Sequence, residues 1–145
     1  WQTDADSYTF IGISYPSLIG MATQIGVVMT AYDGAGNSFP GASSVEFTIN
    51  NSLTQQIFIV STNHATINST NFPSAKFIAT TTGQAYGQLR MVPKASNPEL
   101  QTSGSNGAGL SFLSGLTMFG AVVVPSSNSF FAMEFIGDAA GSLRN

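Results

Sequence analysis

The sequence contains no cysteine and few charged residues, and both shortages limit what the protein can do. Without cysteine, neither a disulfide framework nor a thiolate metal site can form. Charged residues make up only 8% of the chain, against about 25% in typical soluble proteins. Serine, threonine, asparagine and glycine occupy the polar positions instead. A neutral, hydroxyl-rich surface of this kind favours an extracellular or cell-surface location.

Positive charge is especially scarce. The basic residues Lys76, Arg90, Lys94 and Arg144 are scattered along the chain, so no basic stripe exists that could follow a phosphate backbone. We therefore expect no nucleic-acid partner. The uncharged stretch 109–124 is shorter than the roughly 20 apolar residues that a spanning helix needs, and we expect buried strands there and no transmembrane segment.

The first residue is Trp1 rather than methionine, and neither the basic nor the apolar part of a secretory leader follows it. This pattern fits a leader that has been removed or a chain that has been cut, and the composition favours a removed secretory leader. Two sequons, Asn50-Asn51-Ser52 and Asn68-Ser69-Thr70, suit the same setting. Asn50 and Asn68 are therefore candidate glycosylation sites.

Glycine and proline interrupt the chain at short intervals, and the runs between them are rich in β-branched and aromatic residues, as strands separated by turns are. Within 44–50, Val45, Phe47 and Ile49 alternate with polar residues, as a half-buried strand requires. With 43% hydrophobic residues, we expect one all-β domain over 1–145. The predicted strands are 7–15, 25–32, 44–50, 55–61, 75–81, 85–92, 108–113, 117–124 and 129–136, with 55–61 and 75–81 expected at central positions because they are the more apolar.

One helix competes with this interpretation. The segment 16–29, PSLIGMATQIGVVM, places Pro16 at a first helical position, where proline is favoured. Gly20 and Gly26 both weaken a helix, however. The helix and strand alternatives overlap at 25–29, and the sequence leaves both open.

Two stretches resemble bacterial immunoglobulin-like domains of the invasin and intimin type. The segment MTAYDGAGNSFPGASSVEFTI, within 27–50, resembles the family's Asp-x-x-Gly-Asn turn, its Pro-Gly kink and the alternating strand after it, and ATTTGQAYGQLRM, 79–91, is similar to a later hairpin. The resemblance implies an immunoglobulin-like antiparallel β-sandwich on a cell surface and carries no catalytic residue. Family members are usually links in tandem arrays of shorter domains, whereas we expect this chain to stand alone, with extra apolar material from about 103 to 136. The matching turn and strand residues are Asp33, Gly36, Asn37, Pro40, Gly41, Val45 and Phe47.

Chemistry-bearing residues are few, and no catalytic site is expected. His64 is the single histidine, and nothing in the sequence places a nucleophile and an orienting acid beside it. Asp4 and Asp6 would share a calcium ion with Asp33 or Asp138 only if the fold gathered them. We therefore expect no enzyme, no metal and no cofactor.

The apolar segments near the two ends suggest a function. SYTFIGISY and SFFAMEFIG are strongly strand-forming and nearly uncharged, and an exposed strand of that kind pairs with another chain's sheet edge. We predict a self-associating, pilus-like or other extracellular filament subunit in which the segment 1–15 is a donor strand that completes the sheet of the next copy. The alternative is that 7–15 is an ordinary first strand of its own sheet. The predicted interface residues are Tyr8, Phe10, Ile11, Ile13 and Tyr15.

A second hypothesis is a carbohydrate-binding or adhesive module that contacts a glycan or a host or cell-surface receptor. Tyrosine and tryptophan suit sugar stacking because each has a flat apolar ring with a polar group. The long irregular segment 93–108 would add contacts, since such loops are often functional. The aromatic candidates are Trp1, Tyr8, Tyr15, Tyr32 and Tyr86.

Overall fold

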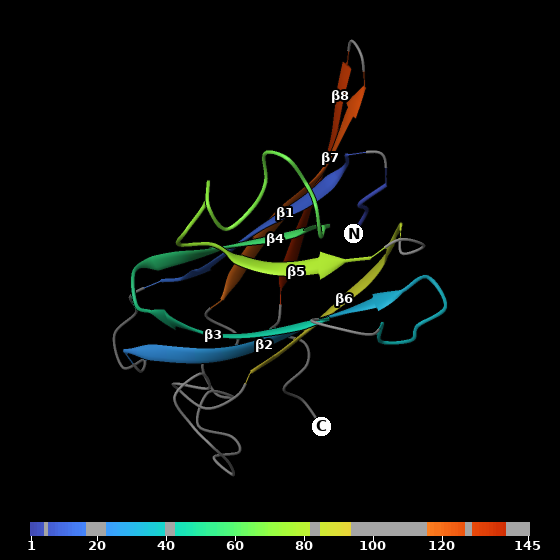
Figure 1. The fold of residues 1–145 in the computed structure, drawn as a ribbon. Coiled ribbons are helices and arrows are strands. Elements are labelled where there is room, and N and C mark those ends of the chain that lie inside the picture. The colour runs from blue at the N-terminus through green and yellow to red at the C-terminus, as the bar shows by residue number, and fades with distance from the viewer. Residues whose placement is uncertain are drawn as a thin grey trace.

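The computed structural model describes residues 1–4, 6–16, 23–39, 43–81, 85–93, 116–126 and 129–138, the last range by its backbone alone. The described part of the chain is all-β (Figure 1) and contains no helix. No described segment therefore has the length and hydropathy of a membrane-spanning helix. The strands are β1 (Tyr8–Tyr15), β2 (Gln24–Asp33), β3 (Ser44–Asn50), β4 (Leu53–Ser61), β5 (Lys76–Thr80), β6 (Gly87–Pro93), β7 (Thr117–Ser126) and β8 (Ser129–Asp138).

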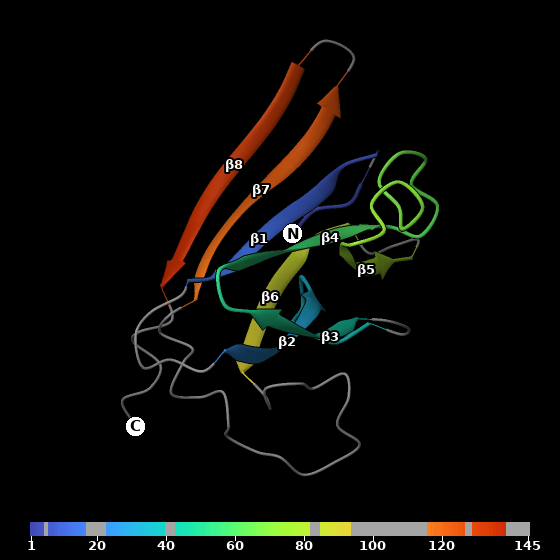
Figure 2. The same cartoon turned by 90° about the vertical axis from the view of Figure 1, so that its left-hand side faces the viewer.

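The strands form two sheets that face each other (Figures 1 and 2). The first has five strands in the order β5-β4-β1-β7-β8, and the second has three in the order β3-β2-β6. All pairs are antiparallel except β4 and β5, which run parallel. This two-layer, all-β architecture is consistent with a β-sandwich.

Side chains from both sheets fill the space between the layers. In β1, Ile11, Ile13 and Tyr15 have no exposed surface, and their sequence neighbours face outward. The alternation predicted for 44–50 is confirmed, because Phe47 and Ile49 are buried in this core and Val45 packs against it. The other buried members are Ile25, Val27, Met29, Ala31, Phe39, Ile57, Ile59, Ile78 and Leu116.

The strand predictions are confirmed for eight of the nine ranges, while 108–113 lies outside the described residues. Of the two alternatives left open for 16–29, the strand is confirmed where the structure describes it. Gln24–Met29 belong to β2, which pairs with β3 on one side and β6 on the other. Two cross-strand partners and four buried apolar side chains in this strand outweigh a helical pattern that two glycines already weaken.

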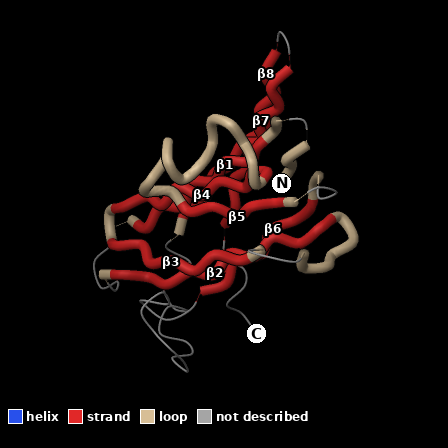
Figure 3. Tube along the Cα trace, in the orientation of Figure 1, coloured by secondary structure: helices blue, strands red, loops and turns tan. Residues whose placement is uncertain are grey.

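Two expectations about the sheets are wrong. The β5 strand is an edge strand rather than a central one, and β4 and β5 are parallel where antiparallel sheets were expected. Both differences come from the connection 62–75, which crosses the outer face of the sheet before the chain returns as β5 (Figure 3). A connection of this length permits a parallel return, which a tight hairpin cannot make.

The connection 62–75 also explains why β5 is apolar at an edge. Ile67 and Phe72 of the connection pack on the outer face of β4 and β5, against Phe58 and Phe77. The Phe58 ring lies 5.0 Å from the Phe72 ring and 5.6 Å from the Phe77 ring, measured between centroids. Both faces of β5 are therefore covered, as they would be in a central strand. For this reason the sequence alone could not show that β5 lies at an edge.

Candidate functional site

The longest open sheet edge among the described strands belongs to β8. This strand pairs with β7 from Thr117 opposite Asp138 to Ser126 opposite Ser129, and no described strand lies on its other side. It has 10 residues, whereas the opposite edge strand, β5, has 5. Its sequence, SFFAMEFIGD, contains two acids and no basic residue. A long, mostly apolar edge is a template for pairing with another chain.

The β7–β8 hairpin extends past the neighbouring strand. Pairing between β1 and β7 stops at Tyr8 opposite Val123, so Val124–Ser126 pair with β8 alone. Figures 1 and 2 show this end of the hairpin projecting from the body of the molecule. The projecting part is a two-stranded ribbon. Within it, the side of β7 that faces away from β8 pairs with no described strand, like the open side of β8.

The five residues predicted for strand donation all lie on β1, at the centre of the five-stranded sheet. Ile11, Ile13 and Tyr15 point into the core, and burial raises the pKa of the Tyr15 hydroxyl. Tyr8 and Phe10 lie half-buried on the outer face, with the rings of Tyr8 and Phe58 6.2 Å apart. In the single chain, β1 fills the position between β4 and β7 that a neighbour's strand would take.

The outer face beside β1 carries a partly exposed aromatic side chain. Phe119 of β7 is 42% exposed, and its ring lies directly over Gly12, where an added Cβ would be 2.4 Å from two ring carbons. Glycine is thus required in the middle of β1 by the approach of this ring. Phe10 continues the aromatic row, with its ring 5.7 Å from that of Phe119.

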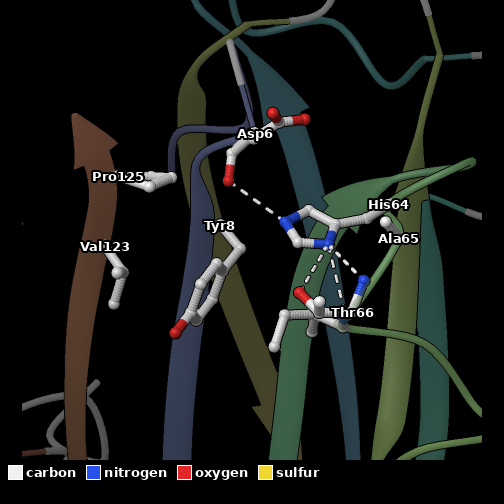
Figure 4. A pocket seen from close by; sticks show the side chains of 8 residues that line it. Asp6, Tyr8, His64, Ala65, Thr66, Val123 and Pro125 are labelled. Atoms are coloured by element: carbon white, nitrogen blue, oxygen red, sulfur yellow. Dashed lines mark hydrogen bonds between the residues drawn. The ribbon is translucent and has the colours of Figure 1, made fainter. Parts of the chain in front are cut away.

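His64 borders a cavity of about 370 Å³ between the connection 62–75, β1 and β7 (Figure 4). Its Nδ1 accepts hydrogen bonds from the backbone N–H groups of Thr66 (3.3 Å) and Ile67 (3.1 Å). Its Nε2 lies 3.1 Å from the backbone oxygen of Asp6. Since Nδ1 accepts, the ring is the neutral tautomer that donates through Nε2.

These bonds give His64 a structural role. The lone pair of Nδ1 is shared by two backbone donors, and the Thr66 hydroxyl is only a distant third neighbour at 3.5 Å. The partner of Nε2 is a backbone carbonyl rather than a carboxylate. His64 therefore tethers the connection 62–75 to Asp6, a residue in the left-handed region with a φ of 66°.

The aspartates considered for calcium are used separately. The Asp33 carboxylate caps its own turn by accepting hydrogen bonds from the backbone N–H groups of Ala35 (2.9 Å) and Asn37 (2.8 Å). Asp4 accepts a hydrogen bond from the Gln2 amide at 2.6 Å. Among the described histidine, aspartate and glutamate residues, no group of three or more could hold a metal ion.

The five aromatic candidates for sugar stacking do not form one platform. Tyr15 is fully buried, the Trp1 ring packs edge-on against Phe39 at 5.7 Å, and Tyr8 contacts the His64 ring. Tyr32 pairs opposite Gln88 at one end of the three-stranded sheet, and Tyr86, two positions before Gln88, is 67% exposed. These two therefore remain as candidates.

The two sequons lie in different surroundings. Asn50 is exposed at the end of β3, and its side-chain oxygen accepts one hydrogen bond, from the Gln24 amide. Asn68 is half-buried, and its amide nitrogen donates to the Ala65 oxygen while its side-chain oxygen accepts from the N–H groups of Thr70 and Asn71. A glycan on Asn68 would attach to the amide nitrogen that donates to Ala65, in a half-buried side chain, so Asn50 is the more accessible candidate.

Sequence reasoning missed a polar surface beside Tyr32. Gln88 and Arg90 share a face of β6 with Tyr86, because exposed and half-buried positions alternate from 86 to 92. This alternation was visible in the sequence YGQLRMV, and its polar members were not recognised as a group.

Searches of family models, curated proteins and solved structures found no match to the chain.

Proposed function

We propose that the protein is a non-catalytic structural subunit of the cell surface or extracellular space that associates with its own copies by β-strand pairing. The observation that carries this proposal is the open edge of β8, ten residues long and adjacent to a projecting ribbon. Unpaired backbone groups at such an edge gain hydrogen bonds when another strand is added. The low charge of the chain, 8% of residues, weakens electrostatic repulsion between copies.

The pairing partner decides whether copies form a closed dimer or a filament. Antiparallel pairing of β8 with β8 of a second copy is two-fold symmetric and stops at a dimer. Pairing of β8 with the opposite edge, β5, is head-to-tail and continues indefinitely. Donation of β1 into the position between β4 and β7 of the next copy is also head-to-tail, and it would preserve every contact that Ile11, Ile13 and Tyr15 make in the single chain. Because both head-to-tail routes continue from copy to copy, we infer that the protein forms a pilus-like or other filament.

The immunoglobulin-like assignment of the invasin and intimin type belongs to this proposal. It rests on the resemblance of 27–50 and 79–91, and the two-sheet architecture supports it. The parallel pair β4–β5 departs from the antiparallel sheets that the resemblance implies. An experimental structure with the strand order of the family would support the assignment, and a different order would remove it.

Self-association is tested by size-exclusion chromatography with light scattering and by negative-stain electron microscopy over a range of concentrations. We expect oligomers or regular filaments from the unmodified protein. The variant Phe131→Lys/Phe135→Lys places two positive charges on β8 and should remain monomeric if the β8 edge is the interface. Leu53→Lys, at a side chain 54% exposed outside this edge, is the control and should assemble normally. A protein that stays at 15.1 kDa at all concentrations contradicts the proposal.

The route of pairing is tested with a disulfide, because the chain has no cysteine of its own. Ser14 of β1 faces Thr54 of β4, with their hydroxyl oxygens 2.7 Å apart. In Ser14→Cys/Thr54→Cys, oxidation of assembled protein should join different copies into a covalent ladder if β1 is donated. If assembly uses the β8 edge alone, the disulfide forms within each chain and denaturing gels show monomers.

A further inference from the structure

A second surface lies on the outer face of the three-stranded sheet, which is on the opposite side of the molecule from the outer face of the five-stranded sheet. A cavity of about 390 Å³ opens there between β2, β6 and the turn that follows β2. It is lined by Tyr32, Gly36, Gln88, Leu89 and Arg90. A tyrosine ring, a carboxamide and a guanidinium are thus gathered in one open hollow, and none of the lining residues is acidic.

The turn beside this cavity is held rigidly. In addition to the carboxylate bonds of Asp33, the Gly36 N–H donates to the Asp33 oxygen at 3.0 Å, and the Asp33 N–H donates to the Asn37 oxygen at 2.9 Å. Gly36 has a φ of 85°, a conformation that glycine adopts without strain. The turn is therefore a preorganised wall, and binding against it would cost little ordering entropy.

One glycine of the turn, Gly34, also makes room for a side chain of the polar surface. An added Cβ on Gly34 would lie 2.6 Å from Cε2 of Tyr86, so this ring rests on the turn. An added Cβ on Gly36 would lie 3.7 Å from Nε2 of Gln88. The sequence DGAGN thus accommodates the Tyr86 ring at Gly34 as well as reversing the chain, and Gly36 is required for its backbone conformation alone.

The charge at this surface is unpaired. Arg90 is exposed, and its guanidinium makes no hydrogen bond or ion pair with any residue in the described part of the chain. The nearest acid along the turn, Asp33, directs its carboxylate at backbone N–H groups. The five donors of Arg90 are consequently available to a ligand, and a planar guanidinium binds a carboxylate through two parallel hydrogen bonds.

We propose that this surface binds an acidic saccharide, a sugar chain that carries carboxylates. Arg90 would bind the carboxylate, the Gln88 amide would exchange hydrogen bonds with hydroxyl groups, and the rings of Tyr86 and Tyr32 would cover the apolar face of a sugar ring. This function goes beyond self-association and uses residues remote from β1 and β8. A subunit with such a site would hold a polyanionic glycan along each copy in the assembly.

Binding is tested by isothermal titration calorimetry with the full chain and a panel of acidic probes: oligogalacturonate, alginate and hyaluronan fragments, and sialyllactose. Fully methyl-esterified oligogalacturonate is the neutral control, since it keeps the ring and loses the charge. We expect at least one acidic probe to bind and its affinity to fall about tenfold or more when the carboxylate is esterified. The absence of binding to every acidic probe at millimolar concentration overturns the proposal, as does equal binding of the ester.

Variants locate the site. Arg90→Gln should lower the affinity for the acidic probe by about tenfold or more. Tyr86→Ala should lower this affinity by roughly the same factor, because stacking is lost. Lys76→Gln removes one positive charge from β5 in the other sheet and should leave the affinity unchanged. Equal losses in Arg90→Gln and Lys76→Gln would show a net-charge effect and contradict a site at Arg90. Unchanged thermal unfolding of the three variants excludes loss of fold as the cause.

Discussion

Two strands of similar composition, β1 and β8, occupy opposite positions in the same sheet. Both are rich in aromatic and aliphatic residues, and β1 contains no charged residue while β8 contains two acids. The first pairs on both sides, with β4 and β7, and places three side chains without exposed surface in the core. The second pairs, among the described strands, with β7 alone. Apolar composition therefore makes a strand, but the number of its partners determines whether it stabilises its own chain or is open to another.

This difference assigns separate roles to the two ends of the described chain. Changes in β1 should be measured as changes in the free energy of unfolding, because its side chains are part of the core. Changes in β8 should be measured chiefly as changes in association, because no described strand pairs with one side of its backbone. The predictions below separate these quantities, from the largest expected effect to the smallest.

Truncation of a core side chain in β1 should have the largest effect. Ile13→Ala removes a fully buried side chain and leaves a cavity, so we expect the free energy of unfolding to fall by about 2–5 kcal/mol. Urea denaturation measures this value. A fall of less than about 1 kcal/mol would mean that β1 is dispensable for the single chain, and the contrast with β8 would disappear.

The close packing of Gly12 against Phe119 should show an intermediate effect. Gly12→Ala forces the Phe119 ring to move, at a cost of about 1–3 kcal/mol. Phe119→Ala removes the obstructing ring, so Gly12→Ala should cost less in that background. A double-mutant cycle by urea denaturation measures the coupling. Additive costs would show that the two residues do not touch.

Alkaline pH should destabilise the chain through Tyr15. Burial raises the pKa of this hydroxyl in the folded state above its ordinary value of 10.0, so the folded protein holds the proton more tightly than the unfolded chain. The contribution to stability is complete below the unfolded pKa and is lost as the pH rises through the folded pKa. Urea denaturation between neutral pH and about pH 11 should show this loss, and Tyr15→Phe should reduce it. An identical pH profile for the variant would contradict the prediction.

Hydrogen exchange should show the smallest difference, one between two strands of the same protein. In the monomer, β1 amides bond to strands on both sides and should exchange only on global opening, whereas outward N–H groups of β8 should exchange faster. Mass spectrometry on Phe131→Lys/Phe135→Lys, the expected monomer, measures this contrast. In assembled protein, β8 should become protected if its edge is the interface. Unchanged exchange of β8 on assembly would place the interface elsewhere.

The candidate surfaces were predictable only in part. Tyr8, Phe10, Ile11, Ile13 and Tyr15 were correctly placed on one strand, because alternation is local. The central location of that strand was not predictable, since it depends on pairing with Phe58 and its neighbours more than 40 positions away and with β7 about 110 positions away. The cluster of Tyr32, Gln88 and Arg90 depends on the same kind of distant pairing.

The sequence by itself determined the all-β class, the strands and the inward-facing side chains, because the alternation and turn residues that specify them act over a few positions. Only the tertiary structure decided that β1 is central, that β5 and β8 are edges, and that β4 and β5 are parallel. It also decided that His64 tethers a connection and that Arg90 lines a cavity with Tyr32. These features depend on which distant strands pair, and pairing is set by the packing of the whole core rather than by any one segment.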